Sequence, residues 1–345
     1  MGLFLSVLIP VLLSFICTYW FTPKFIKILE LEGIIGYDQM KPGKPKVAEM
    51  GAPPVMFGFI VGIFVYIFGQ TFIIKSMSAN DLLQMMAAVT TMIIIAFIGV
   101  LDELTTLMKH REEGKGEFEK LKRRGLKKST QAILPLLGAI PLIAVNAGVS
   151  TITLPFVGMI NIGLIYPLIL IPIAIIGTSN ATNMLAGFNG LQAGIGIVMM
   201  SFLGGFAYLH GEYAATLIAF VFGGALLAFL RYNWYPAKIF PGGLDYLCGT
   251  VIGIIAIVGN MERFAFLCFM PWFLELLLKA RSKFKAQSFG ILQEDGTLKA
   301  PYEKIYSWTH IIMKLGKFKE WQVSLIIIGI IFVWCSIISV LTWII

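Results

Sequence analysis

The chain contains few charged side chains for its length. Asp, Glu, Lys and Arg make up 13% of its 345 residues, whereas hydrophobic residues make up 58%. Soluble domains carry about 25% charged residues. The composition therefore excludes a soluble globular protein and predicts an integral membrane protein.

Cysteine and histidine are also scarce. The four cysteines and three histidines are Cys17, Cys248, Cys268, Cys335, His110, His210 and His310. The cysteines lie in or beside apolar segments without paired spacing, so we expect neither a disulfide framework nor a cysteine metal site. The histidines are too scattered to predict a histidine-based zinc site.

Long apolar runs account for most of the sequence. Runs of about 17–25 residues can cross a bilayer as helices, and ten are centred near residues 11, 62, 93, 138, 169, 200, 221, 252, 269 and 333. We therefore predict a single all-α domain over residues 1–345, a polytopic membrane protein with about ten transmembrane helices. The first run lacks a basic segment and a cleavage site, so we interpret it as the first helix rather than a signal peptide.

Basic residues are concentrated in every second loop. The loops near residues 24–50, 102–129, 179–190, 231–245 and 279–320 hold 25 of the 27 Lys and Arg residues. The positive-inside rule predicts that these loops are cytoplasmic and that both termini lie outside, in a multi-pass plasma membrane protein. The net charge of +8 then suits membrane lipids and anionic substrates. Nucleic acid is not an expected partner, because no sizeable soluble domain is present.

A polar stretch separates two of the apolar runs. Residues 178–190 read TSNATNMLAGFNG and contain Asn180, Asn183 and Asn189. Polar groups near membrane depth are unfavourable unless they are paired or bind a ligand. If this stretch is helical, Asn180 and Asn183 share a face, and Gly187 lets a ligand approach the backbone. The stretch is either a ligand site or a short loop with helix caps.

Two adjacent carboxylates, Asp102 and Glu103, follow the apolar run centred near residue 93. We expect them at the cytoplasmic end of this helix, where the helix dipole opposes negative charge. A metal ion, a lysine partner or a catalytic role would hold them there. A simple helix-end charge is the alternative.

Two further loops contain candidate site residues. Lys41, Lys44 and Lys46 in the turn-rich first loop either bind phosphate or anchor the chain to the membrane. In a later loop Phe240 can stack on a base. Asp245 either caps the helix that follows or serves the site.

The remaining basic loops are expected at the membrane surface. We interpret residues 109–128 as a surface segment in contact with lipid headgroups. Residues 279–320 contain Asp295-Gly296, which predicts the turn of a tight hairpin. We expect this hairpin to belong to a lid over a cytoplasmic-face cleft.

Together these segments resemble the polyprenyl-phosphate N-acetylhexosamine-1-phosphate transferases, of the glycosyltransferase family 4 type. The resemblance rests on NATNMLAGFNGL from Asn180 to Leu191, KPKVAEMG from Lys44 to Gly51 and YNWYPAKIFPG from Tyr232 to Gly242. It covers nearly the whole chain. The motifs are most similar to the archaeal and eukaryotic branch, which makes dolichyl-diphosphate-N-acetylglucosamine.

The resemblance implies an enzyme that initiates lipid-linked glycan assembly. Such an enzyme transfers a sugar 1-phosphate, here N-acetylglucosamine 1-phosphate, from a UDP-sugar to a polyprenyl or dolichyl phosphate. The products are a lipid-diphospho-sugar and UMP, and Mg²⁺ (or Mn²⁺) binds the diphosphate. Dimers are common in this family, so a homodimer is a candidate assembly.

The resemblance also implies roles for individual residues. Asp102 and Glu103 would be catalytic, and Asn183 and Asp245 would bind the metal. The substrate-binding residues would be Asp38, Lys44, Glu49, Asn180, Asn189, Phe240, Arg281 and Lys283. Among these, Asn189 would contact uridine and Phe240 would stack on uracil. Arg281 and Lys283 would contact the sugar.

Three positions depart from the family pattern. The family usually has a second aspartate at Glu103, a lysine at Gln131 and a metal-binding aspartate at Gly243, and the segment that follows is one residue shorter here. Three interpretations stay open: an active transferase with a rearranged metal site that uses Asp245, an inactive paralogue that binds nucleotide sugar or lipid phosphate, and a transporter. The polar residues gather at one membrane face, unlike the midplane sites of transporters.

Overall fold

The structure is a computed structural model that describes residues 2–75, 77–112, 128–154 and 158–344. Helices form most of it. They are α1 (Gly2–Leu31), α2 (Ala52–Phe68), the π-helix η1 (Gly69–Ile74), α3 (Ala79–Glu112), α4 (Lys128–Ile133), α5 (Leu136–Ala144), the π-helix η2 (Tyr166–Leu170), α6 (Ile171–Met184), α7 (Leu191–Leu209), α8 (Tyr213–Asn233), α9 (Leu244–Val258), α10 (Glu262–Cys268), α11 (Met270–Ala280), α12 (Trp308–Leu315) and α13 (Glu320–Ile344). Three antiparallel hairpins pair β1 (Ile35–Tyr37) with β2 (Lys46–Ala48), β3 (Thr151–Leu154) with β4 (Gly158–Asn161), and β5 (Ile291–Leu292) with β6 (Leu298–Lys299).

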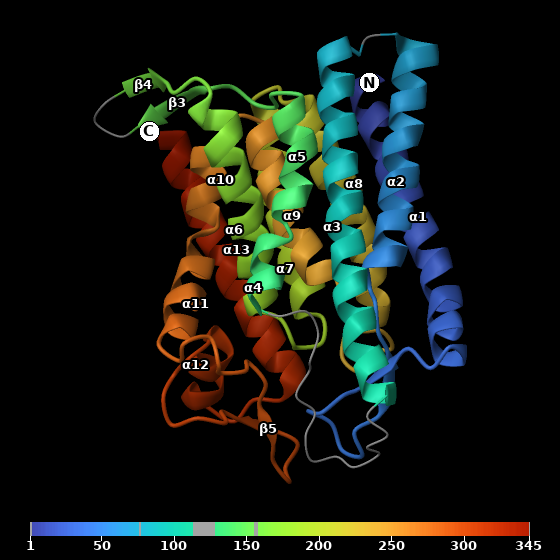
Figure 1. The fold of residues 1–345 in the computed structure, drawn as a ribbon, viewed down its shortest axis with the longest axis vertical. Helices are drawn as coiled ribbons and strands as arrows, with labels where there is room; N and C mark the ends of the chain where they lie inside the picture. The colour runs from blue at the N-terminus through green and yellow to red at the C-terminus, as the bar shows by residue number, and fades with distance from the viewer. Residues whose placement is uncertain (1, 76, 113–127, 155–157, 345) are drawn as a thin grey trace.

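The long helices pack along one another in a bundle whose two ends differ. Figure 1 shows both chain termini and the β3–β4 hairpin at one end. The opposite end carries α12, β5 and the loop that follows α1, and we call it the loop end. Inside the bundle, α9 contacts α3, α6, α7 and α8, and nearly every residue of α9 is buried. This central helix begins at the loop end with Leu244 and has Asp245 in its first turn.

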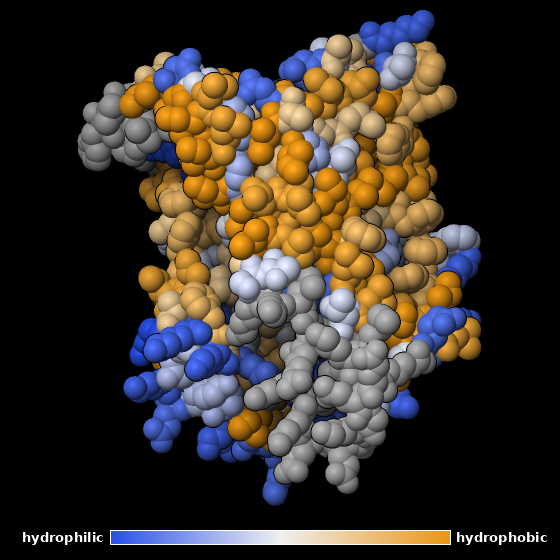
Figure 2. All heavy atoms as spheres, in the orientation of Figure 1, coloured by the Kyte–Doolittle hydropathy of each residue, from blue (hydrophilic) through white to orange (hydrophobic). Residues whose placement is uncertain are grey.

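The apolar runs form membrane-spanning helices. Within the described residues, seven helical segments are long and apolar enough to cross a membrane: Ser6–Leu31, Ala52–Ile74, Ala79–Thr105, Tyr166–Met184, Leu191–Leu209, Tyr213–Asn233 and Glu320–Thr342. Figure 2 shows hydrophobic residues across the middle of the visible face, with hydrophilic residues at both ends. The expected all-α polytopic membrane protein is confirmed.

The other three expected crossings coincide with shorter helices. Ser129–Ala144 and Leu244–Val258 are apolar but too short to be counted as spans by length alone. The run near residue 269 is divided between α10 and α11, just before Pro271. Proline has no backbone N–H and clashes with the preceding helical turn, so it favours such a break. Ten crossings therefore stay a prediction.

Small residues allow α1 and α2 to pack closely. A Cβ added to Gly58 would lie 2.5 Å from the Ser14 carbonyl oxygen, and one added to Gly62 would lie 2.7 Å from the Pro10 carbonyl oxygen. Side chains larger than glycine would push the helices apart at both positions. Small residues four positions apart are typical of helix contacts in membranes, where close packing replaces the hydrophobic driving force.

Two helices extend beyond the ends expected from the sequence. The expectation that a helix ends at Asp102 and Glu103 is wrong, because α3 continues to Glu112. The residues after Glu103 include Leu, Met, Lys and Glu, which favour helix over coil. Similarly, α6 continues through Asn183 to Met184, so only the end of the polar stretch is a loop. Most of the predicted surface segment at 109–128 lies outside the described residues, which omit 113–127.

The loops at the loop end are held by short strands. β2 pairs with β1 and also makes a bridge from Ala48 to Ile239, which connects the first loop to the loop before α9. The predicted hairpin is confirmed: β5 and β6 flank Asp295-Gly296, and Gly296 has a φ of 78°. Glycine adopts this left-handed conformation at no steric cost.

Candidate active site

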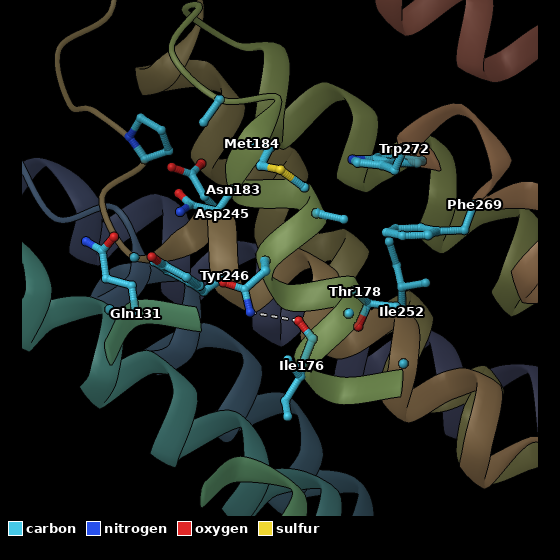
Figure 3. Close-up of a pocket in the computed structure, with 18 of the residues that line it drawn as sticks. Gln131, Ile176, Thr178, Asn183, Met184, Asp245, Tyr246, Ile252, Phe269 and Trp272 are labelled. Carbon is cyan, nitrogen blue, oxygen red and sulfur yellow. Dashed lines mark hydrogen bonds between the residues drawn. The ribbon is translucent and has the colours of Figure 1, made fainter. Parts of the chain in front are cut away.

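A cavity of about 2910 Å³ begins at the loop end and extends along α6 and α9 into the bundle. Polar loop residues line its beginning, and apolar residues such as Ile176 and Ile252 line its middle (Figure 3). It continues to Tyr166 and Glu262, which lie toward the other end of the bundle. The cavity therefore joins a polar chamber to a long apolar groove.

The structure gathers most of the predicted site residues around the polar chamber. The predicted residues that line the cavity are Asp38, Lys44, Glu49, Asp102, Glu103, Asn180, Asn183, Asn189, Phe240, Asp245 and Lys283. Arg281 is not among the lining residues, and its guanidinium donates a hydrogen bond to the Ile305 carbonyl oxygen at 3.3 Å. Lys283 is therefore the better placed of the two basic residues to contact a ligand.

Asn183 and Asp245 come together because α6 packs against the start of α9. The Thr182 hydroxyl donates to the Asp245 carbonyl oxygen at 2.6 Å, and Figure 3 draws Asn183 and Asp245 at the same end of the cavity. The Asn183 amide makes no hydrogen bond to any residue that the structure describes. Its oxygen and the Asp245 carboxylate are hard ligands of the kind that Mg²⁺ prefers.

The described residues supply too few clustered ionisable side chains to hold a metal ion without further ligands. Among the described residues, no group of three or more His, Cys, Asp or Glu side chains forms a metal site. Mg²⁺ is commonly bound by one or two carboxylates together with substrate phosphates and water. The donor set of this chamber fits such a shared site, in which a phosphorylated substrate completes the coordination.

Asp102 is held by the residue that replaces the usual lysine. Gln131 Nε2 donates to both carboxylate oxygens of Asp102, at 2.8 and 2.9 Å. Since Asp102 lies inside α3 rather than at its end, this contact, and not a helix terminus, fixes its direction. Gln131 is neutral, so this contact orients the Asp102 carboxylate without pairing it with a positive charge.

Gly243 brings the backbones of α3 and α9 into contact. It is the N-cap residue of α9 with a φ of 77°, a conformation that other L residues adopt with strain. A Cβ added to Gly99 of α3 would lie 2.5 Å from the Gly243 Cα. Asp245 therefore is not the helix cap but lies in the first turn of α9, where the helix dipole favours its charge.

A buried ion cluster closes the floor of the chamber. Lys41 contacts Asp38 and donates to Glu320 at 2.8 Å, and all three residues are less than 8% exposed. Asn189 joins this cluster: its amide donates to Asp38 at 3.0 Å, and its backbone N–H donates to Glu320 at 2.8 Å. We call Lys41, Asp38, Glu320 and Asn189 the floor cluster.

The floor cluster changes the interpretation of several predicted residues. Lys41 was a phosphate-binding candidate in the sequence, but its ammonium group is committed to two carboxylates and lies 4.6 Å from the Tyr235 ring centre. Asp38 and Asn189 border the cavity while bonding to each other. Sequence reasoning missed Glu320 entirely. Its position at the start of α13, after a basic loop, was the available signal.

Two other predicted residues are fixed by backbone contacts. Asn180 donates to the carbonyl oxygens of Ala132 at 3.1 Å and Ile176 at 2.9 Å, so its amide nitrogen joins α6 to α4. Phe240 donates its backbone N–H to the Ala48 carbonyl oxygen at 2.8 Å. Its ring is partly exposed and lines the cavity, in a position suited to stacking.

The segment between α11 and α13 covers one side of the chamber. Its buried His310 accepts from the Tyr306 backbone N–H at 3.2 Å through Nδ1 and donates from Nε2 to the Gln287 carbonyl oxygen at 3.0 Å. Burial, with a smaller contribution from Lys279, lowers the pKa of His310 to about 4. The imidazole is therefore neutral near pH 7, and its two hydrogen bonds hold this segment together.

Known proteins are similar to this chain over most of its length. A model of the family "Glycosyl transferase family 4" matches residues 85–260. A Saccharolobus solfataricus protein is 37% identical over 94% of this chain and 93% of its own length, and is provisionally named a UDP-N-acetylglucosamine–dolichyl-phosphate N-acetylglucosaminephosphotransferase. A Sulfolobus acidocaldarius protein with the same name is 33% identical, over 96% of this chain and 93% of its own length. A phospho-N-acetylmuramoyl-pentapeptide-transferase of Clostridium perfringens is 26% identical, over 79% and 80%.

Proposed function

Because the chain belongs to glycosyl transferase family 4, we propose that it transfers N-acetylglucosamine 1-phosphate from UDP-N-acetylglucosamine to dolichyl phosphate. The products are dolichyl-diphospho-N-acetylglucosamine and UMP. One observation carries this proposal: a single cavity joins a polar chamber to an apolar groove. Such a cavity suits a water-soluble nucleotide sugar meeting a lipid phosphate. The names of the two archaeal relatives support the same substrates.

The reaction needs two anions to approach each other. A phosphate oxygen of the acceptor lipid attacks the phosphorus that carries the sugar. A new P–O bond forms as the P–O bond to the UMP phosphate breaks, and the electron pair leaves with UMP. Phosphoryl transfer of this kind depends on positioning and on neutralising charge. The chamber therefore has to orient both phosphates and offset their repulsion.

Asn183 and Asp245 are our proposed ligands for Mg²⁺, which Mn²⁺ could replace. The ion, when bound, would supply positive charge to the diphosphate. Asp102, oriented by Gln131, would orient the acceptor phosphate through an ion or water molecule between them. Glu103 lies beside Gly242, where a Cβ would come within 3.1 Å of its side chain, and it adds negative charge at the same place.

The nucleotide sugar would bind nearer the loop end. Phe240 would stack on the uracil ring, since an aromatic face is the usual partner of a base. Asn189 would contact the uridine through atoms that the floor cluster holds in place. Lys44 and Lys283 would face the phosphate and sugar portions. Glu49 borders the same space.

The acceptor lipid would enter from the membrane along the apolar groove. α6, α9 and α11 line it, with Phe269 stacked on Trp272 at a ring distance of 4.5 Å. We propose that the loop end faces the cytoplasm and that both termini lie outside, in a plasma membrane protein. This orientation puts the basic loops where the positive-inside rule expects them.

UMP release tests this function directly. Purified protein would be given UDP-N-acetylglucosamine and dolichyl phosphate, with Mg²⁺ or with EDTA, and the same assay would be run with other UDP-sugars. We expect release that requires both Mg²⁺ and the lipid, and that is lost in Asp245→Asn. No release with any UDP-sugar would refute the proposal.

The second candidate is a catalytically inactive paralogue that binds nucleotide sugar or lipid phosphate. Gly243 and Gln131 favour it, because they stand where the family usually has a carboxylate and a lysine. Calorimetric titration with UDP-N-acetylglucosamine separates the two functions. Binding without turnover supports the inactive paralogue.

A further inference from the structure

Tyr246 places an unused hydrogen-bond donor inside the cavity. It lies in the first turn of α9, is 4% exposed and lines the cavity. Its hydroxyl makes no hydrogen bond to any residue within the described part of the chain. A buried hydroxyl without a partner is unfavourable, and native proteins keep few such groups. We therefore expect the Tyr246 hydroxyl to bond to a ligand.

The surroundings of this hydroxyl identify the chemistry of the ligand. Figure 3 shows the Tyr246 ring extending toward Gln131, and the carboxylates of Asp102, Asp245 and Glu103 act on it electrostatically. A ligand in this space must accept a hydrogen bond and tolerate nearby carboxylates, as a phosphate beside a metal ion does. A phenol provides a donor without adding a charge.

Gln131 cannot provide this donor. Its side chain has one nitrogen with two N–H groups, and that nitrogen donates to both oxygens of Asp102. The residue at the usual lysine position is therefore engaged with protein. Tyr246 lies next to it with its O–H uncommitted.

The position of Tyr246 along α9 distinguishes the two phosphates of the reaction. Asp245 and Tyr246 are followed on the lining face of α9 by Ile252, Gly253 and Ala256, which are apolar. Tyr246 thus marks the boundary between polar chamber and apolar groove. A lipid phosphate lies at this boundary when its chain occupies the groove, whereas the nucleotide lies beyond Asp245 toward the loop end.

We propose that the Tyr246 hydroxyl donates a hydrogen bond to the phosphate of the acceptor lipid and orients it for attack. This inference rests on the proposed function. It assigns acceptor binding to a residue outside the motifs that carry the family resemblance. The Tyr246 hydroxyl offsets the absence of the lysine at position 131.

The test is the kinetics of Tyr246→Phe, in which only the hydroxyl is removed. We expect the kcat/KM for dolichyl phosphate to fall by about tenfold to a hundredfold, as for loss of a hydrogen bond to a charged group. The KM for UDP-N-acetylglucosamine should change by less than about twofold. The melting temperature should not fall, because no hydrogen bond within the described protein is lost. Tyr213→Phe, at the exposed start of α8, is the matched control and should match wild type.

The outcomes separate this inference from the function on which it rests. Wild-type protein without turnover overturns both. Wild-type turnover with an unchanged acceptor kcat/KM in Tyr246→Phe overturns the inference alone. A lower melting temperature with equal losses for both substrates would show a structural role, and a selective rise in the UDP-sugar KM would assign Tyr246 to the nucleotide. Either of these last two results also overturns the inference about Tyr246.

Discussion

Replacing Glu320 with alanine should loosen the floor of the chamber. Glu320 is 2% exposed, accepts hydrogen bonds from Lys41 and from the Asn189 backbone at 2.8 Å each, and begins α13. The substitution leaves a buried ammonium group with Asp38 as its remaining carboxylate partner. It also frees the backbone of the loop that carries Asn189. Ser324, one turn along α13, donates to the Asn189 carbonyl oxygen at 3.0 Å, and this contact and the Asn189–Asp38 hydrogen bond would remain.

The size of the effect follows from the burial of the cluster. Removing one partner of a buried ion pair destabilises a protein by about 3–5 kcal/mol. Asp38 still pairs with Lys41, so the lower limit, about 3 kcal/mol, is the appropriate expectation. For a chain of this size, about 1 kcal/mol corresponds to roughly 2 °C in melting temperature. The variant should melt about 6 °C below wild type.

Thermal unfolding in detergent measures the loss of stability, and UMP-release kinetics measure the effect on the two substrates. Glu320→Ala should raise the KM for UDP-N-acetylglucosamine, because Asn189 borders the nucleotide end, with a smaller effect on the acceptor KM. Glu320→Gln keeps an acceptor for the Asn189 N–H and should fall between alanine and wild type. Glu294→Ala removes an exposed carboxylate between β5 and β6 and is the control. A Glu320→Ala melting temperature within 1 °C of wild type (less than about 0.5 kcal/mol) would refute the reasoning.

Three further predictions address other parts of the structure. Asp245→Asn should lower kcat by about a hundredfold or more, since it removes a proposed metal ligand, with a melting temperature close to wild type; equal activity would contradict its role. Gly99→Ala should destabilise the protein by about 1–3 kcal/mol, because its Cβ would meet Gly243 at 2.5 Å; differential scanning fluorimetry checks this. Burial lowers the pKa of His310 to about 4, against about 6.5 when unfolded, so its contribution to stability is present above pH 6.5 and lost as pH falls. Wild type should lose up to about 3 kcal/mol by pH 4 relative to His310→Gln, and parallel melting curves for the two would contradict this.

Local patterns were sufficient to predict the long membrane helices and to identify polar residues that line one cavity. Apolar runs determine membrane helices because every backbone group must be satisfied within its own segment. The β5–β6 hairpin follows from Asp295-Gly296 at its turn. The polar residues at the loop end could likewise be identified because such groups are rare in an apolar sequence. Their convergence on one cavity follows from the up-and-down order of the helices.

Contacts between distant segments could not be predicted in this way. Lys41 and Glu320 lie 279 positions apart, and no local pattern connects a lysine in a basic loop with one carboxylate among many. The same limit applies to Tyr246. Its residue type suggests an ordinary buried aromatic side chain, and its significance arises from an unpaired hydroxyl beside α3 and α4.

Gly243 shows how the structure changes the meaning of a substitution. In the sequence, glycine at this position is a missing carboxylate. In the structure it is the point at which α9 contacts α3, since Gly99 and Gly243 leave no room for a Cβ on Gly99. An aspartate at 243 would need both a left-handed backbone and space that α3 occupies. The contact instead brings the first turn of α9, with Asp245, toward the helix that carries Asp102. The substitution and the displaced aspartate are therefore two parts of one rearrangement, which favours a rebuilt site over a lost one.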